Sequence, residues 1–320
     1  MRPGRDICFR NSGKGNLFFE RRNLSGVFGR IYRGIANAPN ETMTDASLTQ
    51  VRRAARKRRI VYRHSVFIRL THWINVLCLS ILFMSGLQIF NAHPALYLGS
   101  KSRFDHPILQ IASNADATRG ETTILGRTFD TTGLLGLFKG EGEPLERAFP
   151  PALTLPSYQD LATGRRWHFS FAWLLVANGV LALIYGLASG HLRKDVAPAW
   201  RDLRAIPKSI IEHARLRFSK GEEALRYNPL QKLAYAVILF LVLPVIVLAG
   251  LAMSPGMDAA APWLPALFGG RQSARTVHFI LAFSLVAFVI IHLAMVILTG
   301  PLNNLRSMIT GRYAVEGEDR

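Results

Sequence analysis

The chain has 320 residues, of which 49% are hydrophobic, and a formal net charge of +18 at pH 7. Its two cysteines, Cys8 and Cys78, are too few for a disulfide framework or a cysteine-ligated metal cluster. The apolar residues are concentrated in four long blocks, and this distribution excludes an ordinary soluble domain.

Residues 1–59 form a basic segment without sustained hydrophobic periodicity, and we expect this segment to be disordered. Met43 begins "MTDASLTQ", which looks like a bacterial start, so residues 1–42 are hypothetically a misassigned extension. A long, strongly basic stretch before the first apolar block is not typical of a cleaved secretory signal, and we predict none.

Residues 60–310 are predicted to form an all-α, four-helix transmembrane domain, followed by a C-terminal tail at 311–320. Each apolar block contains about 20 residues, the length that an α-helix needs to cross a hydrocarbon layer of about 30 Å. The predicted spans are about 66–90, 167–189, 231–253 and 276–299.

The charges of the connecting loops predict the orientation. The connection 191–228 carries nine Lys or Arg against five Asp or Glu, whereas the connection 94–166 carries eight of each kind. Under the positive-inside rule, both termini and the 191–228 connection are cytoplasmic, and the 94–166 and 254–275 connections lie outside. The net charge then reflects topology and lipid headgroups, and we expect no nucleic-acid binding.

The two long connections have different characters. The 94–166 connection is rich in Gly and Pro, and a loop of this length between spans is expected to dock on or cover something. Within 191–228, the stretch "AWRDLRAIPKSIIEHARLRF" repeats its apolar residues every three or four positions and predicts one or two amphipathic helices at the headgroup surface.

Four of the nine histidines fall inside the predicted spans. His278 and His292 are fourteen residues apart, so they lie on one side of the fourth span with a rise of about 21 Å between them. His168 near the start of the second span matches the depth of His278, and His72 near the start of the first span matches the depth of His292. The sequence therefore predicts an outer pair, His168 with His278, and an inner pair, His72 with His292.

Paired imidazoles on facing helices suit haem that only transfers electrons, because two axial ligands leave no open position on the iron. No Cys-x-x-Cys-His motif is present for covalent haem attachment. Arg69 beside the inner pair, and Arg165 and Arg166 beside the outer pair, could neutralise haem propionates. Alternatively, these arginines extend to the membrane surface.

Two other interpretations of the histidines remain open. They could be interfacial or interhelical hydrogen-bonding residues of a membrane anchor that binds no haem, or they could serve a proton or ion transporter. The four apolar blocks contain no Asp or Glu, which argues against a proton relay. The matching depths of the pairs favour haem.

Four motifs resemble the bacterial cytochrome b561 superfamily, and specifically the di-haem b subunits of nickel–iron hydrogenases, formate dehydrogenases and thiosulfate-reductase-type complexes. The resemblance covers about residues 60–310. It rests on "HSVFIRLTHW", "GRRWHFSFAW", "RYNPLQKLAY" and the two histidines of the fourth span separated by thirteen residues.

The resemblance implies a protein of the bacterial inner membrane that binds two haem b groups. His72 and His292 would ligate the inner iron, and His168 and His278 the outer iron. Asn228, Gln231 and Lys232 match the family's quinone segment. The implied function is electron transfer between quinone and a periplasmic redox subunit. The 94–166 connection favours a molybdopterin-type oxidoreductase as this partner, with a hydrogenase as the alternative; the chain would be an electron-transfer subunit rather than an independent enzyme.

Overall fold

The computed structural model describes residues 58–138, 143–218, 225 and 227–316, so the predicted disordered segment 1–59 lies outside it except for Arg58 and Arg59. Four helical stretches are long and apolar enough to cross a membrane: α3 (Val66–Asn91), α4 (Leu161–Ala188), Pro229–Ala252 and α10 (Arg271–Leu298). The prediction of four candidate membrane-spanning helices is therefore confirmed.

Polar residues begin the first three spans. Ser65 precedes α3, Asp160 precedes α4 and Asn228 precedes the third span, and each side chain accepts a hydrogen bond from a backbone amide of the first turn. The hydrogen bond from Thr163 N to Asp160, 3.0 Å long, is the main reason why the pKa of this carboxyl lies below its ordinary value. These caps set the helix starts and hence the depth of the side chains that follow.

The third span is continuous but irregular. It consists of α6 (Pro229–Val237), a π-helical turn η4 (Ile238–Val242) and α7 (Leu243–Ala252). Pro244 has no amide hydrogen to donate to the preceding turn, and the wider π turn lies directly before it. The irregularity is thus a local consequence of one proline in an otherwise apolar helix.

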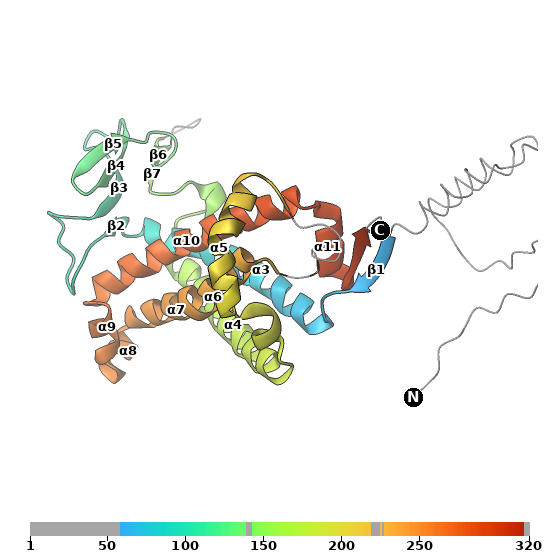
Figure 1. Ribbon diagram of the computed structural model, residues 1–320. Helices are drawn as coiled ribbons and strands as arrows, with labels where there is room; N and C mark the ends of the chain where they lie inside the picture. The colour runs from blue at the N-terminus through green and yellow to red at the C-terminus, as the bar shows by residue number, and fades with distance from the viewer. Residues whose placement is uncertain (1–57, 139–142, 219–224, 226, 317–320) are drawn as a thin grey trace, which may run out of the picture. The chain divides into compact units, whose positions relative to one another are not determined.

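The spans pack as two pairs, α3 beside α4 and α7 beside α10 (Figure 1). Within the first pair, the buried Asn178 of α4 donates to Asn75 Oδ1 at 2.7 Å on α3, an interhelical hydrogen bond of the kind that joins helices in lipid. Between the pairs, α3 meets α10 through aromatic rings, as Phe90 and Phe279 show with centroids 4.8 Å apart.

The expectation of an all-α fold is corrected by the 94–166 connection, which contains strands. An antiparallel sheet has the order β2-β3-β4-β5, and β6 pairs with β7. These strands contain two to five residues each, so their alternation is too short to stand out in the sequence. Their bounds are β2 (Ala95–Leu96), β3 (Leu109–Ser113), β4 (Gly120–Ile124), β5 (Arg127–Asp130), β6 (Gly136–Phe138) and β7 (Leu145–Arg147).

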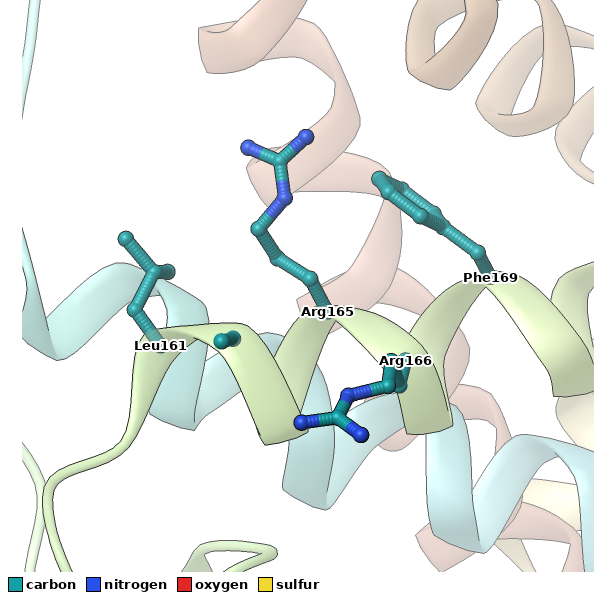
Figure 2. Close-up of a pocket in the computed structure, with 5 residues that line it drawn as sticks. Leu161, Arg165, Arg166 and Phe169 are labelled. Atoms are coloured by element: carbon teal, nitrogen blue, oxygen red, sulfur yellow. The ribbon is translucent and has the colours of Figure 1, made fainter.

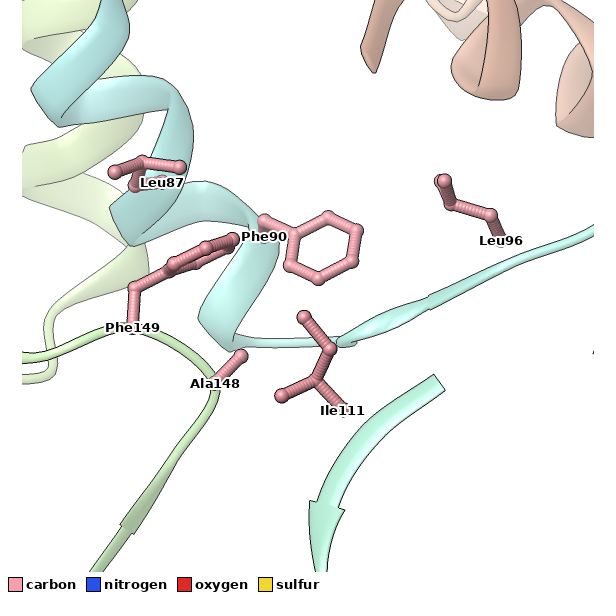
Figure 3. Packing of buried hydrophobic residues seen from close by; sticks show 6 residues of the cluster. All are labelled: Leu87, Phe90, Leu96, Ile111, Ala148 and Phe149. Atoms are coloured by element: carbon pink, nitrogen blue, oxygen red, sulfur yellow. The ribbon is translucent and has the colours of Figure 1, made fainter. Parts of the chain in front are cut away.

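A hydrophobic cluster joins these strands to the end of α3. It consists of Leu87, Phe90, Leu96, Ile111, Ala148 and Phe149, each less than 9% exposed (Figure 3). The cluster combines residues of α3 and the strand region with the chain that returns after β7. We call this end of the helices, where α3 ends and α4 begins, the sheet end.

The opposite end, where α3 begins and α10 ends, is called the terminal end. There β1 (Arg58–Tyr62) pairs antiparallel with β8 (Arg312–Glu316), which lies within the expected tail 311–320. Helix α11 (Pro301–Thr310) precedes β8, and Asn303 of this helix exchanges two 2.9 Å hydrogen bonds with the backbone of Ala314.

Shorter helices complete the described chain. The predicted amphipathic helix is present as α5 (Trp200–Ala214), which packs against α6. The others are η1 (Pro151–Leu153), η2 (Leu192–Val196), α8 (Pro255–Ala260) and α9 (Trp263–Leu267).

Candidate functional site

The structure brings the four span histidines together as two facing pairs. At the sheet end, the ring centroids of His168 on α4 and His278 on α10 are 6.1 Å apart with the planes inclined by 59°. At the terminal end, His72 on α3 and His292 on α10 are 6.5 Å apart with the planes inclined by 50°. The two pairs therefore share α10 and join it to α4 and α3.

A hydrogen bond orients the ring of His168. Its Nδ1 atom lies 3.1 Å from Oγ of Ser85, a fully buried residue of α3. The Ser85 hydroxyl itself donates to the carbonyl oxygen of Ile81 at 2.6 Å, so its oxygen is left to accept a hydrogen bond from His168. With Nδ1 protonated in this way, Nε2 of His168 carries the free lone pair.

The ring of His278 is also oriented by a hydrogen bond at Nδ1, in this case to a different helix. Its Nδ1 lies 2.8 Å from the carbonyl oxygen of Ile246 on α7, and a carbonyl oxygen can only accept. Nδ1 is therefore the donor, and Nε2 again carries the free lone pair. A metal-binding imidazole is commonly held through its second nitrogen in this way.

Two glycines leave room for these rings. A Cβ atom added to Gly86 on α3 would lie 3.4 Å from Cε1 of His168, and one added to Gly250 on α7 would lie 3.3 Å from Cε1 of His278. The His168 ring thus lies against a glycine of α3, the helix that packs beside α4, and the His278 ring lies against a glycine of α7, the helix that packs beside α10.

The terminal-end pair is held differently. Nδ1 of His72 is buried and has no hydrogen-bond partner among the described residues. The ring of His292 stacks on Phe288 with centroids 6.1 Å apart, and the indole of Trp73 meets His72 edge-on. Aromatic packing, rather than hydrogen bonding, defines the surroundings of these two rings.

The spacing of both pairs fits a metal ion held between two imidazoles. With about 2 Å for each metal–nitrogen bond and about 1 Å from each nitrogen to its ring centre, facing rings would have centroids about 6 Å apart. Within the described ranges, no group of three or more His, Cys, Asp and Glu could hold a metal. The pairs therefore suit a metal that brings its other ligands with it, as iron in a porphyrin does.

Contacts with the 94–166 connection fix the position of the start of α10, and thereby the depth of His278 in the membrane. The carbonyl oxygen of Gly99 accepts from the amides of Gln272 and Ser273 at 3.0 and 3.2 Å, and Ser273 Oγ accepts from the Gly99 amide at 2.8 Å. Gly270 has a φ of +116°, and a Cβ there would lie 2.5 Å from the Gly99 backbone, so this close approach requires glycine.

The three arginines expected near propionates lie in different surroundings. The Arg69 guanidinium donates to the carbonyl oxygen of Ile309 on α11, and its Nε is buried without a partner among the described residues. Arg165 and Arg166 are exposed and leave α4 in different directions (Figure 2). Both line an open depression of about 540 Å³. Arg165, one turn before His168, lies 5.2 Å from the Phe169 ring, whereas Arg166 is two residues from His168 and so projects from α4 in another direction.

The residues of the expected quinone segment have structural partners. Asn228 Oδ1 accepts from Leu230 N at 3.0 Å, and Gln231 Oε1 accepts from Asn228 N at 3.2 Å, so these two form the cap of α6. Lys232 Nζ lies 3.1 Å from Asp202 Oδ2 on α5. Of the three residues, Lys232 lines a cavity at the terminal end.

The sequence interpretation missed Arg275 on α10, one turn before His278. Its guanidinium donates to the carbonyl oxygen of His93 and lies 5.7 Å from the Phe90 ring centroid. In the described chain, no carboxylate pairs with Arg275. Nε2 of His93 is buried without a hydrogen-bond partner there, and burial, together with Arg275, lowers the pKa of this imidazole. The three-residue spacing from His278 is the sequence signal that could have identified Arg275.

Four membrane-spanning helices with two facing imidazole pairs define the class of haem-binding membrane cytochromes. A family model described as prokaryotic cytochrome b561 matches residues 63–311. A putative protein-methionine-sulfoxide reductase subunit YedZ1 of Azospira oryzae is 30% identical over 235 residues, which cover 73% of this chain and 90% of that protein. No solved structure matches. The chain belongs to the prokaryotic cytochrome b561 family.

Membership of this family confirms the resemblance seen in the sequence. The protein is a multi-pass membrane protein of the cytochrome b561 type, it binds haem b, and it transfers electrons.

Proposed function

We propose that the protein binds two haem b groups and conducts electrons across the bacterial inner membrane, between a quinone at its terminal end and a redox enzyme at its sheet end. The observation that carries the proposal is the pair of facing imidazole sites, at 6.1 and 6.5 Å, fourteen residues apart along α10. A helix rise of about 21 Å between them suits transfer from one side of a membrane towards the other.

The protein's own residues have distinct parts in this function. His168 and His278 would hold one haem, and His72 and His292 the other. Ser85 and the Ile246 carbonyl each accept a hydrogen bond from Nδ1 of a sheet-end imidazole. Nε2 of each ring therefore keeps the lone pair with which it would bind the iron. Bound haem supplies the one-electron chemistry. Aromatic and aliphatic side chains between the helix pairs keep the surroundings dry and of low dielectric constant.

Cations next to the histidines would balance the propionate charges. At the sheet end, Arg275 is the better candidate than Arg166, because it is half-buried, lies one turn from His278 and contacts His93, whose Nε2 is unsatisfied in the described structure. Arg165 remains a second candidate there, since it shares the His168 side of α4. Arg69 is the corresponding candidate at the terminal end, with a buried and unpartnered Nε.

We place the quinone near Asn228, Gln231 and Lys232. The position of Lys232 in the lining of the terminal-end cavity supports this assignment. Asn228 and Gln231 would act by fixing the start of α6, because their polar atoms are engaged in its cap. Replacing Lys232 by Gln should raise the KM for quinol and leave the haem spectrum unchanged.

The redox partner would bind at the sheet end, on the periplasmic side under the positive-inside rule. The name of the Azospira oryzae relative supports a protein-methionine-sulfoxide reductase as this partner. A molybdopterin-type oxidoreductase is the partner class that the sequence resemblance favours, and a hydrogenase is the alternative. Co-purification of the complex from native membranes tests the partner class.

Haem stoichiometry tests the central proposal. The purified chain should contain two haems, with the absorption spectrum of a reduced b-type cytochrome. His278→Ala and His168→Ala should each remove one haem, and His72→Ala and His292→Ala the other. His106→Ala is the control, because the imidazole of His106 is exposed and pairs with Asp105 at 3.4 Å.

Retention of both haems in any of the four variants would contradict the ligand assignment. A wild-type protein with no Soret band would instead favour a transporter or an anchor that binds no haem.

A further inference from the structure

A cavity of about 680 Å³ opens at the terminal end, where α3 begins and α4 ends. Its volume is within the range of about 300–1,000 Å³ that small-molecule sites occupy. Ser65 and Ile68 at the start of α3 line one side, and Tyr185 and Ser189 at the end of α4 line another. Tyr185 donates to Ser65 Oγ at 3.0 Å, which ties these two walls together.

The lining is cationic. Arg63, Arg201 and Lys232 contribute to it, together with the imidazoles of His64 and His191. Of the three cations, Lys232 is the one that pairs with a carboxylate within the described residues, at 3.1 Å from Asp202. Arg63 instead stacks on an aromatic ring, with its guanidinium carbon 4.8 Å from the Tyr313 centroid. Within the described residues, neither Arg63 nor Arg201 forms an ion pair with a carboxylate, so the three cations outnumber the one carboxylate that pairs with them.

Asp202, the carboxylate that pairs with Lys232, is already engaged. Asp202 Oδ2 accepts a hydrogen bond from Ala199 N at 2.9 Å in addition to the contact with Lys232. These contacts, the Ala199 hydrogen bond first, hold the pKa of Asp202 below its ordinary value. Asp202 therefore stays ionised at neutral pH, and its single charge faces both Lys232, with which it forms the ion pair, and the neighbouring Arg201.

The protonation state of His64 depends on the same positively charged surroundings. This side chain is 8% exposed, and burial, followed by the charge of Arg63, lowers its pKa to about 4. His64 is therefore neutral at pH 7 and can offer a hydrogen bond to a ligand without adding charge. The cavity combines an excess of positive charge with neutral donors, and this combination is suited to an anion.

We propose that this cavity binds a phosphate group, supplied by the headgroup of an anionic lipid or by free phosphate. Arginine guanidinium groups match the oxygens of a phosphate with paired, charge-assisted hydrogen bonds, which are stronger than those to a neutral acceptor. The cavity lies where two spanning helices end, and its rim carries Tyr62, Tyr185 and Tyr227, a residue type enriched at the level of lipid headgroups. Basic pockets between helices at this level commonly bind acidic headgroups.

Lys232 belongs to the same lining, so the phosphate site adjoins the quinone position proposed above, and a binding experiment without quinol tests it separately. The full chain is purified in detergent, delipidated, and titrated with inorganic phosphate, with dioctanoyl phosphatidylglycerol and with dioctanoyl phosphatidylcholine, while thermal unfolding is followed. We expect phosphatidylglycerol or phosphate to raise the unfolding temperature in a saturable way. Arg201→Gln should raise the apparent Kd about tenfold, which corresponds to the loss of one charge-assisted contact.

Arg204→Gln is the matched control, because Arg204 is exposed on the same helix one turn later but does not line the cavity. Arg63→Gln should weaken binding as Arg201→Gln does, and Arg63→Lys, which keeps the charge, should restore part of it. This rescue separates loss of the ligand contact from general damage to the fold.

Each outcome decides the matter. Stabilisation by phosphatidylglycerol alone identifies a headgroup site, and stabilisation by inorganic phosphate identifies a site for a soluble phosphate. The proposal is overturned if neither ligand stabilises the protein, if phosphatidylcholine does so equally well, or if Arg201→Gln binds as tightly as Arg204→Gln. It is also overturned if Arg63→Gln alters the haem spectrum while ligand binding is unchanged, since Arg63 would then serve the haem.

Discussion

The rings of His168 and His278 face each other 6.1 Å apart, and each is held from behind by a helix other than its own. Ser85 on α3 holds His168, and the Ile246 carbonyl on α7 holds His278. All four spans therefore contribute to one site. Because the supporting contacts fix which nitrogen is protonated, they are expected to matter for haem binding almost as much as the histidines do.

Ser85→Ala should weaken binding of the sheet-end haem. The substitution removes the hydroxyl that lies 3.1 Å from Nδ1 of the half-buried His168 ring, so the ring is held less firmly in its orientation. Loss of such a supporting contact typically lowers metal-site affinity by about 10–100-fold. Haem content after dilution and the rate of haem transfer to apomyoglobin measure the effect.

Ser80→Ala is the control for this substitution. Ser80 is exposed on the same helix and donates only to the Val76 carbonyl oxygen at 2.8 Å. Equal haem loss in the two variants would show that Ser85 does not orient His168.

Gly86→Ala and Gly250→Ala should disturb the sheet-end haem although alanine is the better helix former. An added Cβ would lie 3.3 Å from the His278 ring in Gly250→Ala, which is tighter than an ordinary contact, so this ring must shift slightly; at 3.4 Å from the His168 ring, Gly86→Ala is at the limit of ordinary contact and should have the smaller effect. A shift in the low-spin electron paramagnetic resonance signal of one haem would report a changed angle between its ligands.

Gly179→Ala provides the comparison, because nothing lies within 4 Å of a Cβ at this exposed position of α4. It should stabilise the helix by up to about 1 kcal/mol and leave both haem signals unchanged. Identical spectra for all three glycine variants would argue against close packing of the glycines on the imidazoles.

Arg275→Gln should lower the reduction potential of the sheet-end haem. Removal of a half-buried positive charge one turn from His278 favours the ferric form, which carries the additional positive charge. We expect a shift of tens of millivolts, since about 59 mV corresponds to a tenfold change for one electron. Redox titration followed in the α-band measures the two haems separately.

Arg271→Gln tests the specificity of that shift. Arg271 is an exposed residue one turn earlier on α10 and donates to the Met253 carbonyl oxygen at 2.9 Å. A shift as large as that of Arg275→Gln would indicate a general effect of surface charge rather than a propionate contact.

Asp202→Asn should destabilise the terminal end by about 1–3 kcal/mol, because it leaves the charge of Lys232 unpaired at a site where the two side chains are only 12–14% exposed. Glu212→Gln on the same helix is the control, since its 3.8 Å pair with Lys208 is exposed and worth less than about 0.5 kcal/mol. Unfolding of both variants in denaturant gives the comparison.

The same pair predicts a pH dependence of stability. The pKa of Asp202 is lower in the folded protein than the ordinary pKa of an aspartate, which is about 4. Ionised Asp202 therefore contributes its full stabilisation at pH values above this ordinary pKa. This contribution should disappear as the pH falls through the lowered pKa. The difference in unfolding temperature between wild type and Asp202→Asn should therefore shrink between about pH 5 and pH 3; a constant difference would contradict the assignment.

The sequence by itself determined the four spans and the pairing of the histidines by depth. Both follow from local rules: a membrane demands about 20 apolar residues, and an α-helix has a fixed rise and rotation per residue. Because these quantities depend only on position along one helix, His278 and His292 could be assigned to opposite ends of a common face before any packing was known.

Only the tertiary structure decided what surrounds those rings. Ser85, Gly250 and the carbonyl oxygen of Ile246 approach the imidazoles from neighbouring helices. Gly250 and Ile246 both belong to the third span, whose course is altered by the π turn before Pro244. The strands at the sheet end and the Arg275 contact with His93 likewise join segments far apart in the chain. Such contacts depend on how helices pack, and the helical period of a single segment contains no information about its neighbours.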